Sequence, residues 1–140
     1  MLKAIGAFAI GSVLVLCACS SHKTLTRDDL RSDTISAKSL AAETSLFLDY
    51  VCQHRATEHY AQGHIEYLAQ EIDQSRQELQ KSSPAQGEEH ALQDLKLQFD
   101  ALSAELHNIH QKLGDENALA TAKQHIARIQ RALDEANSSL

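Results

Sequence analysis

The chain has 140 residues, a formal net charge of −6, 4% aromatic residues and no Trp. The acidic balance argues against nucleic acid and anionic lipid as partners, because both reward Lys and Arg. The scarcity of aromatic residues argues against a stacking platform for bases or sugars. The length suits a single domain.

The first 19 residues carry the pattern of an export signal. Lys3 supplies a positive charge, residues 4–16 are uncharged, and Ala18 is the small residue that a signal peptidase needs before the cut. The uncharged run is shorter than the about 20 residues that a membrane-spanning helix needs. The tetrapeptide Leu16-Cys17-Ala18-Cys19 resembles the lipobox of bacterial lipoproteins.

This resemblance implies that residues 1–18 are a signal peptide and that Cys19 carries the lipid, since Cys17 follows the large Leu16. Ser20 stands where Asp would signal retention in the inner membrane. The implied location is therefore the periplasmic face of the outer membrane, or the cell membrane of a host that has only one. The alternative is an ordinary secretory signal without lipid. The segment 19–25 is short and polar, which predicts a tether between the lipid and the helical domain.

Removal of the signal and lipidation of Cys19 would leave Cys52 as the one remaining cysteine. A lone thiol in an oxidising compartment favours an intermolecular disulfide, or stays free. The alternative is that Cys52 is a small, half-buried apolar residue on a helix face.

A long helix is predicted from about residue 26 to 82. Thr26 and Asp29 approximate a capping box at its start. A heptad pattern of mostly apolar residues then stays in phase for about 50 residues, which favours one continuous helix. The internal Gly63 costs only about 1 kcal/mol and leaves the phase unshifted.

Two further helices follow, over about residues 84–113 and 115–137. Pro84 marks the turn before the second helix, and Glu88 is the alternative start of that helix. Gly114 ends it and Asp115 begins the next. The apolar residues of both helices recur at steps of three and four: Leu92, Leu95, Phe99, Leu102, Leu106, Ile109 and Leu113, then Leu119, Ala122, Ile126, Ile129, Leu133 and Ala136.

These segments predict an all-α fold, an antiparallel up-down-up helical bundle with one long N-terminal helix. The second and third helices would cover only half of the first, whose remaining apolar stripe then needs a cover. A second copy or a partner protein is one solution. The other is a break near Glu43 to Ser45, which would give a four-helix bundle. The stripe that would serve as the interaction surface comprises Leu40, Phe47, Leu48 and Val51.

The strongest candidate for metal chemistry is the pair His54 and Glu58, one helical turn apart and near the Gly114 turn. With His110 they would form a cluster suited to a divalent metal. The alternative is a hydrogen-bonded polar layer that fixes the register of the helices. His107 and His110 form a second pair, at a step of three residues.

Aromatic and imidazole side chains are dense in the middle of the predicted long helix. Tyr60, His64 and Tyr67 share a face beside the apolar stripe, with Tyr50 and His54 shortly before them. Such a group would serve as a partner-binding patch or simply cover the edge of the core.

The function predicted is a lipid-anchored periplasmic interaction or scaffold protein that forms a homo-oligomer or binds a protein partner. The first alternative is a metal-binding or metal-sensing lipoprotein. The second is a chaperone-like stress protein, since Leu25-Thr26 and Asp29 resemble in part the LTxxQ repeat of helical periplasmic stress chaperones. We expect no enzyme activity, because the sequence has no nucleophile motif or phosphate loop, and no cofactor besides the lipid and a potential metal.

Overall fold

The computed structural model describes residues 23–140, so the predicted signal peptide and the lipidation site at Cys19 lie outside the described residues. The described part contains four helices and two very short strands. The helices are α1 (Arg27–Cys52), α2 (Glu58–Gln80), α3 (Glu89–Gln111) and α4 (Glu116–Ser139), and the strands are β1 (Thr24–Leu25) and β2 (Ser83–Pro84).

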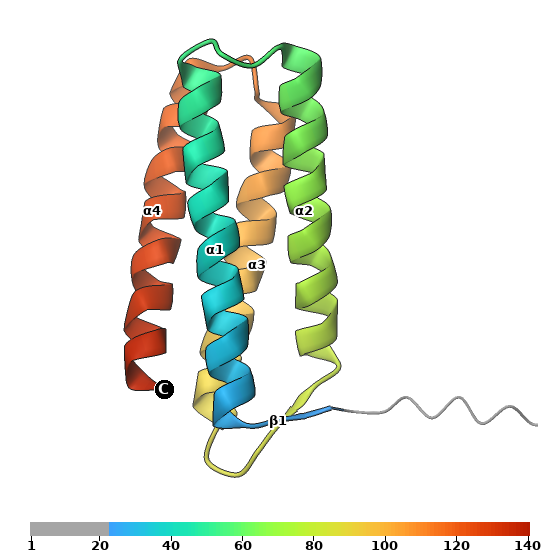
Figure 1. Cartoon of the computed structure of the whole chain (residues 1–140), viewed down its shortest axis with the longest axis vertical. Coiled ribbons are helices and arrows are strands. Elements are labelled where there is room, and N and C mark those ends of the chain that lie inside the picture. The colour runs from blue at the N-terminus through green and yellow to red at the C-terminus, as the bar shows by residue number, and fades with distance from the viewer. Residues whose placement is uncertain (1–22) are drawn as a thin grey trace, which may run out of the picture.

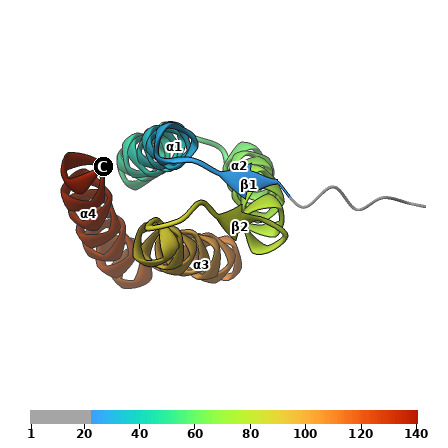
Figure 2. The ribbon, with the colours of Figure 1, turned by 90° about the horizontal axis from the view of Figure 1, so that it is seen from below.

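The four helices form one antiparallel bundle (Figure 1), which confirms the predicted all-α helical bundle. Viewed along the helices, α1 lies beside α4, α4 beside α3 and α3 beside α2 (Figure 2). The contacts between α1 and α2 are fewer than those of these three pairs. The bundle is therefore closed on three sides and more open on the fourth.

The prediction of one continuous helix over residues 26–82 is wrong. Helix α1 ends at Cys52, and α2 begins at Glu58 after the linker 53–57. His54 leaves the helical conformation with a φ of 54°, and the Thr57 hydroxyl accepts a hydrogen bond from the Tyr60 N–H at 3.3 Å. The alternative of a four-helix bundle is the fold observed, although the break comes after Cys52 instead of near Glu43 to Ser45.

The fold-back also covers the apolar stripe of α1, so the expectation that this stripe stands uncovered is wrong. Leu48 is fully buried and Phe47 is 8% exposed, while Leu40 and Val51 are partly buried against the core. Helix α4 packs along α1 and supplies the cover, so of the two predicted solutions the fold-back is the one observed. Burying this stripe within the chain removes apolar area from water without an association cost.

The helix ends of the second half lie close to the predicted ones. Helix α3 starts at Glu89, near the later of the two predicted starts, and ends at Gln111. The carboxylate of Asp115 caps α4 by accepting hydrogen bonds from the N–H groups of Asn117 and Ala118 at 3.0 and 3.1 Å. The predicted capping box of α1 is confirmed, since Thr26 N–H donates to Asp29 Oδ2 at 2.9 Å and Asp29 N–H donates to Thr26 Oγ1 at 3.3 Å.

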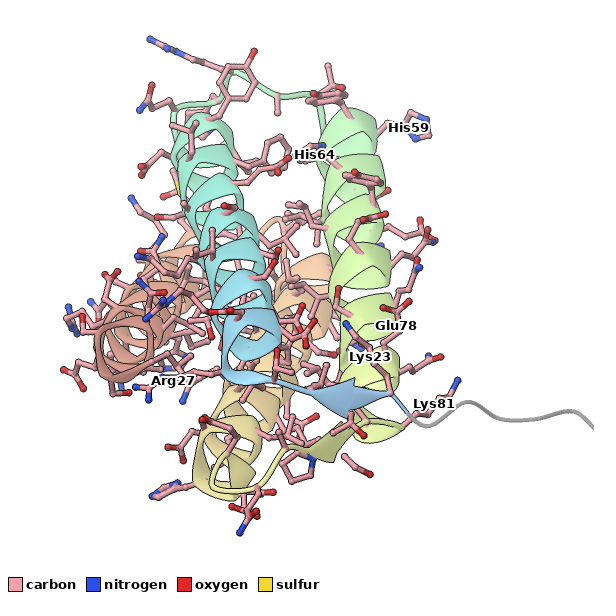
Figure 3. The ribbon with its side chains drawn as sticks, turned by 60° about the horizontal axis from the view of Figure 1, so that its bottom comes forward. Lys23, Arg27, His59, His64, Glu78 and Lys81 are labelled. Atoms are coloured by element: carbon pink, nitrogen blue, oxygen red, sulfur yellow. The ribbon has the colours of Figure 1, made fainter. Side chains whose placement is uncertain are left out.

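The predicted tether over residues 19–25 is wrong for its last two residues, which form β1. Thr24 and Leu25 pair in parallel with Ser83 and Pro84 of the segment between α2 and α3. The Ala85 N–H donates to the Leu25 carbonyl at 2.8 Å, and Leu25 is only 1% exposed. Leu25 therefore belongs to the hydrophobic core, and Lys23, two residues earlier, lies at the β1 end of the bundle (Figure 3).

No helix within residues 23–140 is both long and apolar enough to cross a membrane.

Candidate interaction site

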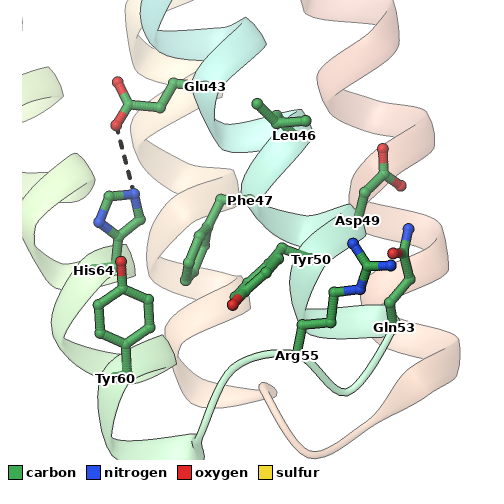
Figure 4. Close-up of a pocket in the computed structure, with 9 residues that line it drawn as sticks. All are labelled: Glu43, Leu46, Phe47, Asp49, Tyr50, Gln53, Arg55, Tyr60 and His64. Carbon is green, nitrogen blue, oxygen red and sulfur yellow. Dashed lines mark ion pairs between the residues drawn. The ribbon is translucent and has the colours of Figure 1, made fainter.

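Exposed apolar side chains gather where the C-terminal half of α1 faces the N-terminal half of α2. Leu46 is 72% exposed, Tyr60 56%, Tyr67 50% and Tyr50 41%. They surround or flank a hollow of about 490 Å³ between the two helices and the linker 53–57 (Figure 4). We call this hollow the distal groove, and it is lined by Glu43, Leu46, Phe47, Asp49, Tyr50, Gln53, Arg55, Tyr60 and His64.

The floor of the distal groove is the ring of Phe47. Its centroid lies 4.2 Å from that of His64, 5.9 Å from that of Tyr60 and 6.5 Å from that of Tyr50. Tyr67 extends this row of rings, 6.1 Å from His64. One buried ring thus holds partly exposed rings from both helices. The resulting surface combines apolar contact area with polar tips, as is typical of protein interfaces.

Two acidic side chains of the groove, Glu43 and Asp49, contact basic side chains of other helices. His64 Nε2 lies 3.5 Å from Glu43 Oε1 and links α2 to α1 across the groove. Asp49 pairs with Lys123 of α4, and its hydrogen bond raises the pKa of the Lys123 ammonium. The first contact joins the two helices that line the groove, and the second joins α1 to α4.

Spacing along the helices accounts for the row of rings. Tyr60, His64 and Tyr67 recur at steps of four and three, so they lie on one side of α2. The prediction that these three residues share a face is confirmed, and Tyr50 joins them from α1. His54 does not, because its place in the linker directs it toward Glu116 of α4, with 3.8 Å between Nε2 and Oε1.

Sequence reasoning missed the residues that the fold-back brings to the groove from α1 and the linker. Glu43 and Leu46 sit on α1, where the predicted continuous helix would have placed them far from Tyr60 and His64. Arg55 joins them from the linker. No local signal in the sequence marks these positions, since they acquire their neighbours only through tertiary structure.

The three predicted metal ligands are not brought together. His54 and Glu58 line one hollow, which also includes Glu116 near the Gly114 turn. His110 lines a different hollow, together with His107. Within residues 23–140, no group of three His, Cys, Asp or Glu side chains is arranged to hold a metal ion. The expectation that His54 and Glu58 share a helix face is wrong, because α1 ends at Cys52.

Cys52 is the last residue of α1, and its thiol is free and exposed among the described residues. The alternative of a half-buried apolar residue is therefore wrong. An intermolecular disulfide through Cys52 stays a prediction.

A polar cluster on the other side of α2 joins this helix to α3. Ser103 Oγ donates to Asp73 Oδ1 at 2.6 Å, and His107 Nε2 lies 3.0 Å from Asp73 Oδ2. The Ser103 hydrogen bond is the largest cause that lowers the pKa of Asp73, followed among the lowering causes by the contact with His107. The carboxylate stands between the hydroxyl and the imidazole, whereas a hydrolytic triad places the imidazole between the other two. The geometry of this cluster therefore fits a structural contact that holds α2 against α3.

Comparison of the chain with protein-family models, curated proteins and solved structures finds no match.

Proposed function

We propose that this protein is a lipid-anchored helical interaction protein that binds a partner through the distal groove. The observation that carries the proposal is the gathering of Leu46, Tyr50 and Tyr60 around one hollow with a buried aromatic floor, which Tyr67 extends along α2. Exposed apolar residues scattered singly need no explanation, whereas a contiguous patch around a concavity favours a binding site.

The proposed anchor supports this role through its position. Only residues 20–22 separate Cys19 from Lys23, so the lipid would lie within about 14 Å of the start of the described chain. The strands and the α1–α2 linker, which borders the groove, lie at opposite ends of the bundle (Figure 1), and α1 with its 26 residues is about 39 Å long. The groove would therefore project away from the membrane, where a periplasmic partner can reach it.

Fatty-acid labelling tests the anchor. A clickable fatty acid fed to cells that express the full chain should label the wild type and Cys17→Ser, and should not label Cys19→Ser. Labelling that persists in Cys19→Ser would contradict the assignment of the lipid to this residue. Loss of label in both variants would be explained by failed processing, so the length of the mature chain is measured by mass spectrometry alongside.

Paired truncations on two faces test the groove. Tyr60 lines the groove and Leu97 does not, and they are 56% and 53% exposed on different helices, so Tyr60→Ala and Leu97→Ala remove side chains of similar exposure. Interface residues that matter cost more than 1 kcal/mol on truncation, or about fivefold in affinity. After mild crosslinking in cells, we expect Tyr60→Ala to reduce recovery of the crosslinked complex severalfold, with Leu97→Ala at the level of the wild type. Equal recovery in both would reject the groove as the binding site.

A further inference from the structure

The distal groove is one of two hollows along the open side of the bundle, where α1 faces α2. The second hollow has a volume of about 130 Å³ and lies near β1, at the opposite end of the same pair of helices. We call it the proximal hollow. It is lined by Asp33 and Ser36 of α1, by Ser75, Glu78 and Leu79 of α2, and by Lys23, Leu25, Ser82 and Phe99.

The proximal hollow has an excess of negative charge. Among the described residues, the Asp33 carboxylate forms no ion pair or hydrogen bond, and the Glu78 carboxylate accepts one hydrogen bond, from the Gln74 amide at 3.4 Å. Lys23 also lines the hollow, and it is paired with Asp29 at 3.2 Å. Burial raises the pKa of Asp33, and the neighbouring Asp29 and Glu78 raise it further, while Lys23 offsets part of this effect.

The two hollows share both of their helices, so one elongated ligand can reach both. We call the side of the bundle where α1 faces α2 the seam. On α2, His64 lies at the distal end of the seam and Glu78 at the proximal end, with Lys23 beside Glu78 (Figure 3). Phe47 and Asp33 are 14 positions apart on α1, which corresponds to about 21 Å along a helix axis. A bound helix would need about 14 residues, or four turns, to span this distance.

Charge decides between the candidate occupants of the seam. A second copy of this chain carries the same net charge of −6 and would bring its own Asp33 and Glu78 toward an acidic surface. A segment with Lys or Arg would instead add positive charge beside Asp33 and Glu78, where Lys23 is already paired with Asp29. Amphipathic helices commonly bind in grooves between two helices through apolar anchors at steps of three and four.

We propose that the seam between α1 and α2 binds an amphipathic helix of a partner protein, with an apolar or aromatic anchor in the distal groove and a Lys or Arg over Asp33 and Glu78. This inference rests on the proposed function and specifies the partner's chemistry and its direction of binding. The anchor and the basic residue of the partner are separated by three to four helical turns.

Photo-crosslinking from both hollows tests the proposal in the full chain. A photo-reactive amino acid replaces Tyr60 in one variant and Ser75 in another, and mass spectrometry identifies the residues joined to each in cells. We expect both positions to capture one segment of the same partner, with the attachment sites 10 to 14 residues apart and Lys or Arg close to the site joined to position 75. Circular dichroism confirms that both variants fold.

Each other outcome overturns the proposal in a distinguishable way. Capture at position 60 of a segment without basic residues, or of a second copy of this chain, rejects the basic helix and leaves the distal groove as a binding site. Absence of any capture at either position, with both variants folded and anchored, rejects the inference and the proposed function together.

Neutral substitutions test the contribution of charge. In the chain with the photo-reactive residue at position 60, Asp33→Asn combined with Glu78→Gln should lower the yield of the crosslinked complex by about fivefold, as expected for loss of ion pairs. The matched control is Glu66→Gln, which removes a carboxylate from the α3 side of α2. An unchanged yield in the double variant, or an equal fall in the control, would reject the role of these two carboxylates.

Discussion

At the scale of single residues, the ionised Asp33 carboxylate is expected to lower the stability of the fold. Its carboxylate is partly buried beside Asp29 and Glu78, and burial is the largest cause of its raised pKa. Positions that break the usual rules of stability are often retained for function. Asp33 lines the hollow in which we propose that a basic side chain binds.

The raised pKa of Asp33 predicts a pH-dependent gain for Asp33→Asn. Just above the ordinary value of 3.8, the folded state holds a proton that the unfolded chain has already lost. The free energy of unfolding therefore falls as the pH rises through that window. At pH 7 the variant should be more stable than the wild type, and this gain should shrink below pH 3.8. Urea unfolding of both chains at pH 3 and pH 7 measures the difference.

Glu71→Gln is the control for this measurement, because Glu71 lies exposed on the same helix as Glu78. It should change the midpoint little at either pH. A loss of stability in Asp33→Asn at pH 7 would show that the ionised carboxylate stabilises the fold.

The break at His54 could not be predicted from the sequence. No Gly or Pro marks the linker, and the heptad phase continues through Ala61 and Ile65, so the sequence favours a continuous helix. Two separate helices that both face one core produce the same apolar pattern. The left-handed conformation of His54, with its φ of 54°, is imposed by tertiary structure and has no local signal.

At the scale of elements, the linker 53–57 is tested by His54→Gly. Glycine adopts positive φ without the steric cost that other residues have, so this change should raise the free energy of unfolding by about 0.5 to 1 kcal/mol. In a continuous helix the same substitution would lower it by about that amount. Loss of the exposed contact with Glu116 should matter little. Chemical denaturation of the full chain in detergent measures the change.

Ala104→Gly serves as the reference for a glycine inside a helix, because Ala104 is exposed in the middle of α3. It should lose about 1 kcal/mol. A similar loss in His54→Gly would contradict the break between α1 and α2.

The pairing of β1 with β2 is tested by Leu25→Ala. Leu25 is 1% exposed, so removing its side chain should lower the free energy of unfolding by about 2 to 5 kcal/mol. Thr24→Ala, at the exposed neighbouring position, should stay within about 0.5 kcal/mol of the wild type. If residues 19–25 were a free tether, neither substitution would change the denaturation midpoint.

At the scale of the whole molecule, the sequence predicts the helical bundle correctly because every helix repeats apolar residues at steps of three and four. It also predicts that Tyr60, His64 and Tyr67 share a face, since this depends only on their spacing along one helix. It cannot predict that Glu43 and Leu46 face them, because that depends on the fold-back. The same fold-back buries the apolar stripe around Leu48. The distal groove is then the surface at which we propose that a partner binds.

The central claim is that a partner binds on the α1–α2 side of the bundle, with the distal groove as its main contact. The most direct measurement places a photo-reactive amino acid at Leu46 or at Leu97 of the full chain in living cells. Both positions are highly exposed, but only Leu46 lines the groove. We predict a discrete crosslinked species from position 46 and none from position 97. Crosslinking from position 97 alone, or equal crosslinking from both, would contradict the claim.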